Sequence, residues 1–331
     1  MRLQRSASDL GGVGTICAEP DLHMWRAESI GEAVPEHAAG TVHSVFRHAC
    51  NIETAGGELV TLLASIQGNS AHGIKLAHPV TPLDAWLSAG QDALIEQALL
   101  RVPAAAVGID LSGASVWRGE IAAVRVDACA NALSQMRSTL CERAGAHGFA
   151  AVLVAARAAD SAIGLALEAR LSSALPALAQ ATACHDSAAV ADIAAKLVGL
   201  GPGLTPSGDD FLTGYLAALW SRGRTECGIA ALLKRLNVCF APLFPRTNAI
   251  SRQMLRDAVQ GRFSEHLAKL ISAVANERDV VGATVRALQT GHSSGADTVC
   301  GLLFGYAPGM VRLAAPTPLR VRSKSFVNAF G

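Results

Sequence analysis

The sequence predicts an α+β protein, β-rich in its N-terminal part and mostly helical in its C-terminal part. Between residues 41 and 130, short runs with β-branched residues alternate with glycine-containing turns, a pattern typical of strands. After residue 130 the chain becomes rich in Ala and Leu at helical spacing. Hydrophobic residues make up 50% of the 331 residues, so both parts have enough apolar side chains for a core. The expected organisation is an irregular N-terminal arm (1–40), a β-rich domain (41–130), a helical domain (131–307) and a basic C-terminal tail (308–331).

The β-rich part contains three strand-like runs separated by turn signals. They are residues 42–52, 58–65 and 115–126. Gly56 and Gly57 stand between the first two runs and are typical of a hairpin turn. Residues 82–100 show helical spacing of their Leu and Trp residues instead, so a helix is expected there.

The helical part is divided by caps and glycines. Asp186 or Ser187 is the expected start of one helix, and Gly199 its expected end. The expected helices have the approximate bounds 131–145, 160–174, 187–198, 209–221, 226–238, 247–260, 264–276, 279–290 and 296–306.

Composition and charge exclude several classes of protein. The net charge of +1 argues against a nucleic-acid partner or a polybasic membrane contact. No run reaches the roughly 18 to 20 apolar residues of a membrane span, and the N-terminus lacks the apolar segment of a signal peptide. Eight scattered cysteines without a Cys-x-x-Cys pair are typical of free thiols in a reducing cytoplasm. Because only 17% of residues are charged, we expect part of the apolar surface to be covered in an oligomer.

The most informative stretch is the glycine-rich segment 199–210, which runs directly into a predicted helix. Its glycines and prolines exclude regular structure. Ser207 is the expected N-cap, and Asp210 three residues later completes a pattern like a capping box. The free N–H groups of such a helix start favour a bound anion.

A second stretch repeats this pattern. Residues 294–303 match 207–216 in the pattern Ser-Gly-x-Asp-x-x-x-Gly-x-Leu, at one offset of 87 residues (294 − 207). The match is compatible with chance, with a shared capping solution, or with two helices whose N-termini converge on one site.

Candidate catalytic residues follow from these stretches. Adjacent carboxylates at Asp209 and Asp210 repel the anion that the loop attracts, unless they serve as caps, a cation bridges them to the substrate, or an amide or ammonium group of the substrate donates to them. Mg²⁺ is therefore a candidate cofactor, with Asp209, Asp210 and Asp297 as candidate ligands. His292 lies in a turn of small residues, from which it would act as a general acid or base or remain a surface residue.

The candidate residues are assigned by role. Asp210, His292 and Asp297 are the catalytic candidates. Arg246 offers a guanidinium fork for carboxylate or phosphate, and Asn248 is either a substrate contact or a helix cap. A polar loop at residues 67–72 is a weaker candidate, with Asn69 and His72. The substrate or anion site is expected to contain Gly201, Gly203, Thr205, Ser207, Gly208, Asp209, Arg246, Asn248, Ser294 and Gly295.

The motifs resemble those of a known family. Residues 199–212, the segment Thr247-Asn-Ala-Ile-Ser251 with Gly261-Arg-Phe263, and residues 291–297 are similar to the AllH-like family, a bacterial family long described as a domain of unknown function. The resemblance implies a component of an oxamate carbamoyltransferase in allantoin degradation, with FdrA-like and AllG-like partner subunits. It also implies a small anionic substrate such as carbamoyl phosphate, oxamate or phosphate. It assigns no catalytic residue.

Three functions remain open from the sequence. The first is a carbamoyltransferase-like subunit in which the glycine loop binds an anion. The second is a metal-dependent hydrolase that uses the aspartate motifs, and the third is a non-catalytic assembly or regulatory subunit.

Overall fold

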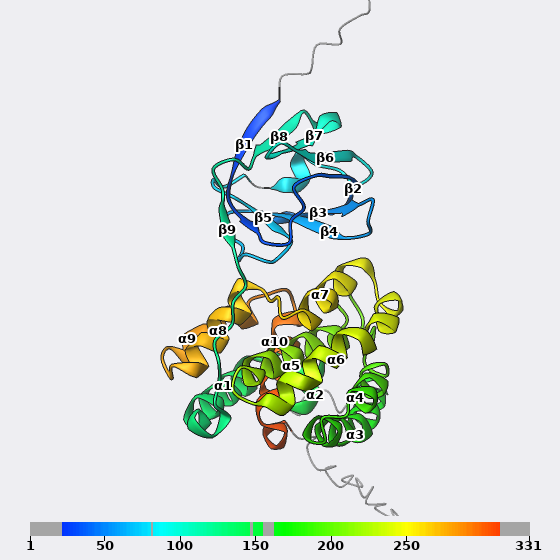
Figure 1. Ribbon diagram of the computed structural model, residues 1–331, viewed down its shortest axis with the longest axis vertical. Coiled ribbons are helices and arrows are strands. Elements are labelled where there is room, and N and C mark those ends of the chain that lie inside the picture. Colours follow the sequence, from blue (N-terminus) through cyan, green and yellow to red (C-terminus); the bar gives the residue numbers. More distant parts are fainter. Residues whose placement is uncertain (1–21, 81, 146–147, 155–161, 312–331) are drawn as a thin grey trace, which may run out of the picture.

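The computed structural model describes residues 22–80, 82–145, 148–154 and 162–311, with the side chains of 162–166 left out. Within this range the chain forms a β-barrel region followed by a mostly helical region, so the predicted α+β class is confirmed (Figure 1). The first 21 residues of the expected arm and residues 312–331 of the expected tail lie outside the described residues.

The barrel is built from one highly curved sheet. Its strands pair in the order β5-β4-β3-β2-β6-β7-β8-β1-β9, and an additional β5–β1 pairing closes the ring. Closure removes open sheet edges, which are otherwise sites of aggregation. The strands are β1 (His23–Gly31), β2 (Ala38–Val45), β3 (Ala49–Thr54), β4 (Leu59–Leu63), β5 (Gly73–Leu76), β6 (Asp92–Glu96), β7 (Leu99–Val102), β8 (Val107–Asp110) and β9 (Ser115–Trp117).

Side-chain alternation explains how this barrel fills its interior. In β6, Ala93 and Ile95 are buried while Asp92 and Glu96 are exposed, as expected for a strand with one face in the core. The predicted hairpin joins β3 to β4 antiparallel, and Gly57 has a φ of +74° in its turn.

Three expectations for the barrel are wrong. Residues 23–31 are not part of an irregular arm but form β1, which pairs with both β8 and β5 and so closes the barrel. Residues 82–100 are not a helix, because Gly90 takes a φ of +87° and separates a short 3₁₀ turn from β6. The third strand-like run is a strand only over 115–117.

The helical part follows the predicted sequence of elements closely. Asp186 caps α4 by accepting from the backbone N–H groups of Ala188 and Ala189, as the sequence indicated. The short helix α2 was not predicted. The α-helices are α1 (Ala130–Arg143), α2 (Gly148–Leu153), α3 (Ala162–Ala183), α4 (Ser187–Ala194), α5 (Ser207–Gly223), α6 (Cys227–Cys239), α7 (Ala249–Val259), α8 (Glu265–Ala275), α9 (Val280–Leu288) and α10 (Ser294–Tyr306). The 3₁₀ helices are η1 (Leu83–Ala85), η2 (Pro103–Ala105), η3 (Val126–Ala128), η4 (Ala241–Arg246) and η5 (Pro308–Met310).

Helices α5 and α10 form the centre of the helical part, and glycines bring them into close contact. A Cβ on Gly214 would lie 1.9 Å from the carbonyl oxygen of Thr298, and a Cβ on Gly301 would lie 1.9 Å from that of Phe211. These two contacts are related by the same offset of 87 residues (301 − 214 and 298 − 211) as the sequence repeat. The repeat is therefore also a structural repeat, in which each helix presents its glycine to the backbone of the other.

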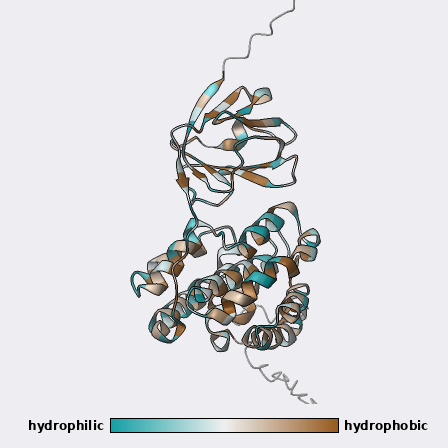
Figure 2. Ribbon diagram, in the orientation of Figure 1, coloured by the Kyte–Doolittle hydropathy of each residue, from teal (hydrophilic) through white to brown (hydrophobic). Residues whose placement is uncertain are grey.

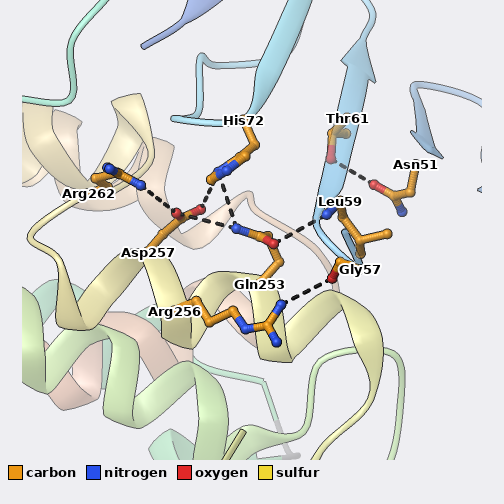
Figure 3. A network of polar contacts seen from close by, with 9 residues as sticks. All are labelled: Asn51, Gly57, Leu59, Thr61, His72, Gln253, Arg256, Asp257 and Arg262. Atoms are coloured by element: carbon orange, nitrogen blue, oxygen red, sulfur yellow. Dashed lines mark hydrogen bonds and ion pairs between the residues drawn. The ribbon is translucent and has the colours of Figure 1, made fainter. Parts of the chain in front are cut away.

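The two parts have separate hydrophobic cores. Figure 2 shows hydrophobic residues in both parts, and the buried ones form one cluster in the barrel and another among the helices. Contacts across the boundary are polar in Figure 3, where His72 faces Asp257 and the backbone N–H of Leu59 donates to Gln253. Arg256 donates to the carbonyl oxygen of Gly57 beside them. No helix among the described residues is long and apolar enough to cross a membrane.

Candidate functional site

A cleft of about 1500 Å³ lies between the barrel and the helices. Its walls come from segments far apart in the sequence: the barrel loop at 67–71, the glycine-rich loop at 200–205 and the residues at 290–295 that begin α10. Because pockets between domains are frequent ligand sites, this cleft is the candidate functional site.

The N-termini of α5 and α10 meet at the floor of the cleft. Ser207 and Ser294, the first residues of the two helices, both line it. The Ser294 hydroxyl donates to Oδ1 of Asp210 over 2.6 Å. The structure thus brings together the two Ser-Gly-x-Asp motifs.

Asp210 is fully buried behind this floor. Its Oδ2 has no hydrogen-bond partner among the described residues. Burial raises the pKa of Asp210 to about 7; the Ser294 hydroxyl opposes this rise and the neighbouring Asp297 adds to it. The carboxyl group is therefore partly protonated near neutral pH.

Asp297 occupies the matching position on α10. Its Oδ1 accepts from the backbone N–H of Ala150 over 2.9 Å. Burial raises the pKa of Asp297 to about 6, although hydrogen bonds from Ala150 and Ser207 lower it. Gly148 has a φ of +84°, and a Cβ there would lie 2.4 Å from Oδ2 of Asp297. Only glycine allows the start of α2 to approach this carboxyl group so closely.

Asp209 has a different role from its neighbour. One of its oxygens accepts from the backbone N–H of Gly199 over 2.9 Å, and the other accepts from the Thr247 hydroxyl. Burial raises its pKa, and these two donors oppose the rise. Asp209 therefore ties the glycine-rich loop and the start of α7 to α5.

The capping prediction at this helix is wrong. The helix begins at Ser207 rather than after it, the N-cap position is Pro206, and no side chain caps it. The reason is that Asp210 turns toward Ser294 on α10 instead of back toward its own helix start. Backbone carbonyls accept from the first turn of α5 instead: the N–H of Gly208 donates to Leu200, and that of Asp209 donates to Pro206.

The glycines among the predicted residues shape the loop and the two helix starts. Gly201 and Gly203 have positive φ values of +116° and +103° in the exposed loop. Gly208 and Gly295 allow close backbone packing, since a Cβ on each would lie 1.9 and 2.2 Å from the carbonyl oxygens of Leu197 and Ala287.

The remaining predicted residues are divided between the cleft and its surroundings. Thr205 and His292 line the cleft, and His292 is exposed. Asn248 caps α7 by accepting from the N–H of Ser251, and its amide donates to the carbonyl of Leu204, which holds the glycine-rich loop. Arg246 does not line the cleft but a separate hollow beside the loop.

Within the described ranges, no group of three or more His, Cys, Asp or Glu side chains is placed to hold a metal ion. Both oxygens of Asp209 are already hydrogen-bonded within the protein. Asp210 and Asp297 each keep one oxygen without a partner among the described residues.

Several cleft residues were not among the sequence candidates. The barrel contributes Asn51 and Thr61, which are hydrogen-bonded to each other over 2.8 Å, and the helices contribute Arg170, Arg262 and His266. Arg262 lies in the Gly261-Arg-Phe263 segment of the family resemblance, but no motif marks the other positions, because they meet only when the two parts fold against each other. Asn69 and His72, the weaker candidates, both hydrogen-bond across the boundary, to Glu265 and Asp257 respectively.

Two family models match the chain, on either side of the cleft. The model described as the AllH family N-terminal domain matches residues 23–116, and the model described as oxamate carbamoyltransferase subunit AllH matches residues 197–306. The first match spans the barrel, and the second contains both helix N-termini at the cleft floor. No solved structure was found that matches the chain. The chain belongs to the AllH family of oxamate carbamoyltransferase subunits.

Proposed function

We propose that this chain is the substrate-binding subunit of a carbamoyltransferase. The enzyme moves a carbamoyl group between oxamate, or a related amide, and phosphate during the breakdown of allantoin. The family description supports a carbamoyltransferase subunit. A subunit by that description works with other subunits, and FdrA-like and AllG-like proteins are the partners we propose.

One observation carries this proposal. The N-termini of α5 and α10 converge on one cleft, and each places a serine hydroxyl at its surface with an aspartate behind it. The positive ends of the two helix dipoles together with hydroxyl donors are suited to an anionic carboxylate or phosphoryl group.

The protonation of Asp210 reduces the repulsion between the carboxyl groups of the site and a bound anion. With a pKa of about 7, Asp210 is close to half protonated at neutral pH. A neutral carboxyl group donates its proton to the oxygen of Ser294, so that the Ser294 hydroxyl turns its own hydrogen toward the ligand. In carbamoyl transfer, negative charge develops on the carbonyl oxygen, and donors fixed in advance stabilise it.

Calorimetric titration of the full chain tests the proposal. Carbamoyl phosphate, oxamate and phosphate are titrated separately, each with and without Mg²⁺, into the wild-type chain, Ser294→Ala and Asp210→Asn. We expect binding by the wild-type chain that is weakened about tenfold or more in both variants, as for lost hydrogen bonds to a charged ligand. Ser134→Ala, at an exposed serine on α1, is the matched control and keeps wild-type affinity.

Activity of the assembled complex gives the result that would contradict the proposal. If the assembled complex binds these ligands and turns them over unchanged with Ser294→Ala and Asp210→Asn in place, the substrate site is on another subunit. A requirement for Mg²⁺ in the wild-type titration would add a bridging cation to the site.

A further inference from the structure

A second hollow, of about 480 Å³, lies beside the glycine-rich loop. It is lined by the middle of α3, the segment that follows α4, and the last residue of η4. Arg170, Lys196 and Arg246 come from these three elements and face the same space. Ser173 adds a hydroxyl group, and none of the described residues that line the hollow is acidic.

The concentration of positive charge is local. The whole chain has 28 basic and 27 acidic residues, so a wall with three cations and no carboxylate departs from the rest of the molecule. Within the described residues, none of the three forms an ion pair, whereas Arg222, Arg262 and Arg286 each have an acidic partner. Cations that repel each other around a hollow favour an anion that neutralises them.

The hollow adjoins the cleft. Arg170 and Leu200 line both spaces. Gly199 lies in its wall with a φ of +74°, and a Cβ there would lie 2.7 Å from the carbonyl oxygen of Arg246. The N–H of the same glycine donates to Asp209, the residue before Asp210.

We propose that this hollow is a second anion site, separate from the helix N-termini of the cleft, and that it binds a phosphoryl group. Two guanidinium forks and one ammonium group are the usual donors to phosphate oxygens. Inorganic phosphate and a phosphate monoester share this chemistry, and the space is wide enough for either. The inference does not depend on the proposed carbamoyl transfer, because the cleft floor and the hollow have no polar side chain in common other than Arg170.

The test is titration of the full chain with inorganic phosphate and, separately, with phenyl phosphate at constant ionic strength. Arg246→Gln and Lys196→Gln remove charge from the hollow, and each has a control that removes the same charge elsewhere. Arg224→Gln, beyond the far end of α5, is the control for the arginine, and Lys234→Gln on α6 is the control for the lysine. All four side chains are exposed, so the fold is expected to tolerate each change, which a thermal unfolding curve checks.

We expect about a tenfold or greater loss of phosphate affinity in Arg246→Gln and Lys196→Gln, and less than about twofold in the controls. The hollow variants and their controls are made in the Ser294→Ala background, where phosphate binding at the cleft is already weakened, so the binding that remains reports on the hollow. Tighter binding of phenyl phosphate than of inorganic phosphate would identify an organic phosphate as the ligand. Equal affinities in the hollow variants and their controls, or no phosphate binding left in the Ser294→Ala background, would overturn the proposal.

Discussion

At the scale of single residues, the buried carboxyl group of Asp210 makes the stability of the protein depend on pH. Its pKa is about 7 in the folded chain and near 3.8 when the chain is unfolded. Below pH 3.8 both states hold the proton, so the stabilisation is complete. Between these two values only the folded state keeps the proton, so the free energy of unfolding falls as pH rises, by up to about 1.4 kcal/mol per pH unit.

Asp210→Asn removes this dependence, because the amide does not ionise. The difference in unfolding free energy between wild type and variant is measured by urea denaturation from pH 4.5 to pH 8. We expect the difference to shift steadily in favour of the variant as pH rises toward about 7, and then to level off. Asp192→Asn, at an exposed position on α4, is the control that stays parallel to wild type. A constant difference between wild type and Asp210→Asn would contradict the raised pKa.

At the scale of elements, the glycines of α5 and α10 hold the two helix starts together. Gly214→Ala and Gly301→Ala place a methyl group against the backbone of the facing helix, where no flexible side chain is available to move aside. We expect each variant to lose about 1–3 kcal/mol of unfolding free energy, as in overpacked cores, despite the better helix propensity of Ala. Urea denaturation measures the loss.

Gly223→Ala at the end of α5 is the matched control. Its new methyl group would meet the tip of the Leu233 side chain at 3.0 Å, and that side chain has rotamers to change. We expect little change in stability. The assignment of the close contact would be wrong if all three variants were equally stable.

The same elements show what sequence reasoning can reach. The helices were predictable because each has a 3.6-residue apolar spacing and local punctuation, such as the Asp186 cap. The strands of the barrel are short, and β1 pairs with residues far away in the sequence: Ala27 with Leu76, 49 residues on (76 − 27), and Arg26 with Asp110, 84 residues on (110 − 26). Local pattern therefore revealed the hairpin of β3 and β4 but not β1.

Some residues of the candidate site were also predictable from the sequence, and others were not. The repeat at 207–216 and 294–303 identified the helix starts, because repeated motifs are visible along the chain. Gly148, Arg170 and Thr61 were not identified, because their place in or beside the cleft comes from packing between distant elements.

At the scale of the whole molecule, polar contacts join two parts with separate cores. Glu265 at the start of α8 accepts from both the backbone N–H and the amide of Asn69, each over 2.9 Å. Burial raises the pKa of Glu265, but hydrogen bonds from Asn69 and Lys269 outweigh this effect and lower the pKa to about 2. The ionised Glu265 side chain therefore stabilises the fold above about pH 4.5, and this stabilisation is lost as the pH falls toward 2.

Glu265→Ala removes this clamp without touching either core. We expect faster hydrogen exchange at the amide of Asn69, by about tenfold or more, because its acceptor is lost. Small-angle scattering is expected to show a larger radius of gyration as the cleft opens. Glu142→Ala, at an exposed glutamate on α1, is the control. Unchanged exchange at Asn69 in Glu265→Ala would show that other contacts hold the two parts together.

The paired helix starts form a nearly symmetric arrangement that α2 makes unequal. Asp297 receives a backbone N–H from Ala150, whereas Asp210 receives the hydroxyl of Ser294. Their pKa values of about 6 and about 7 differ accordingly. The negative charge of Asp297 raises the pKa of Asp210, so ionisation at one helix start disfavours ionisation at the other.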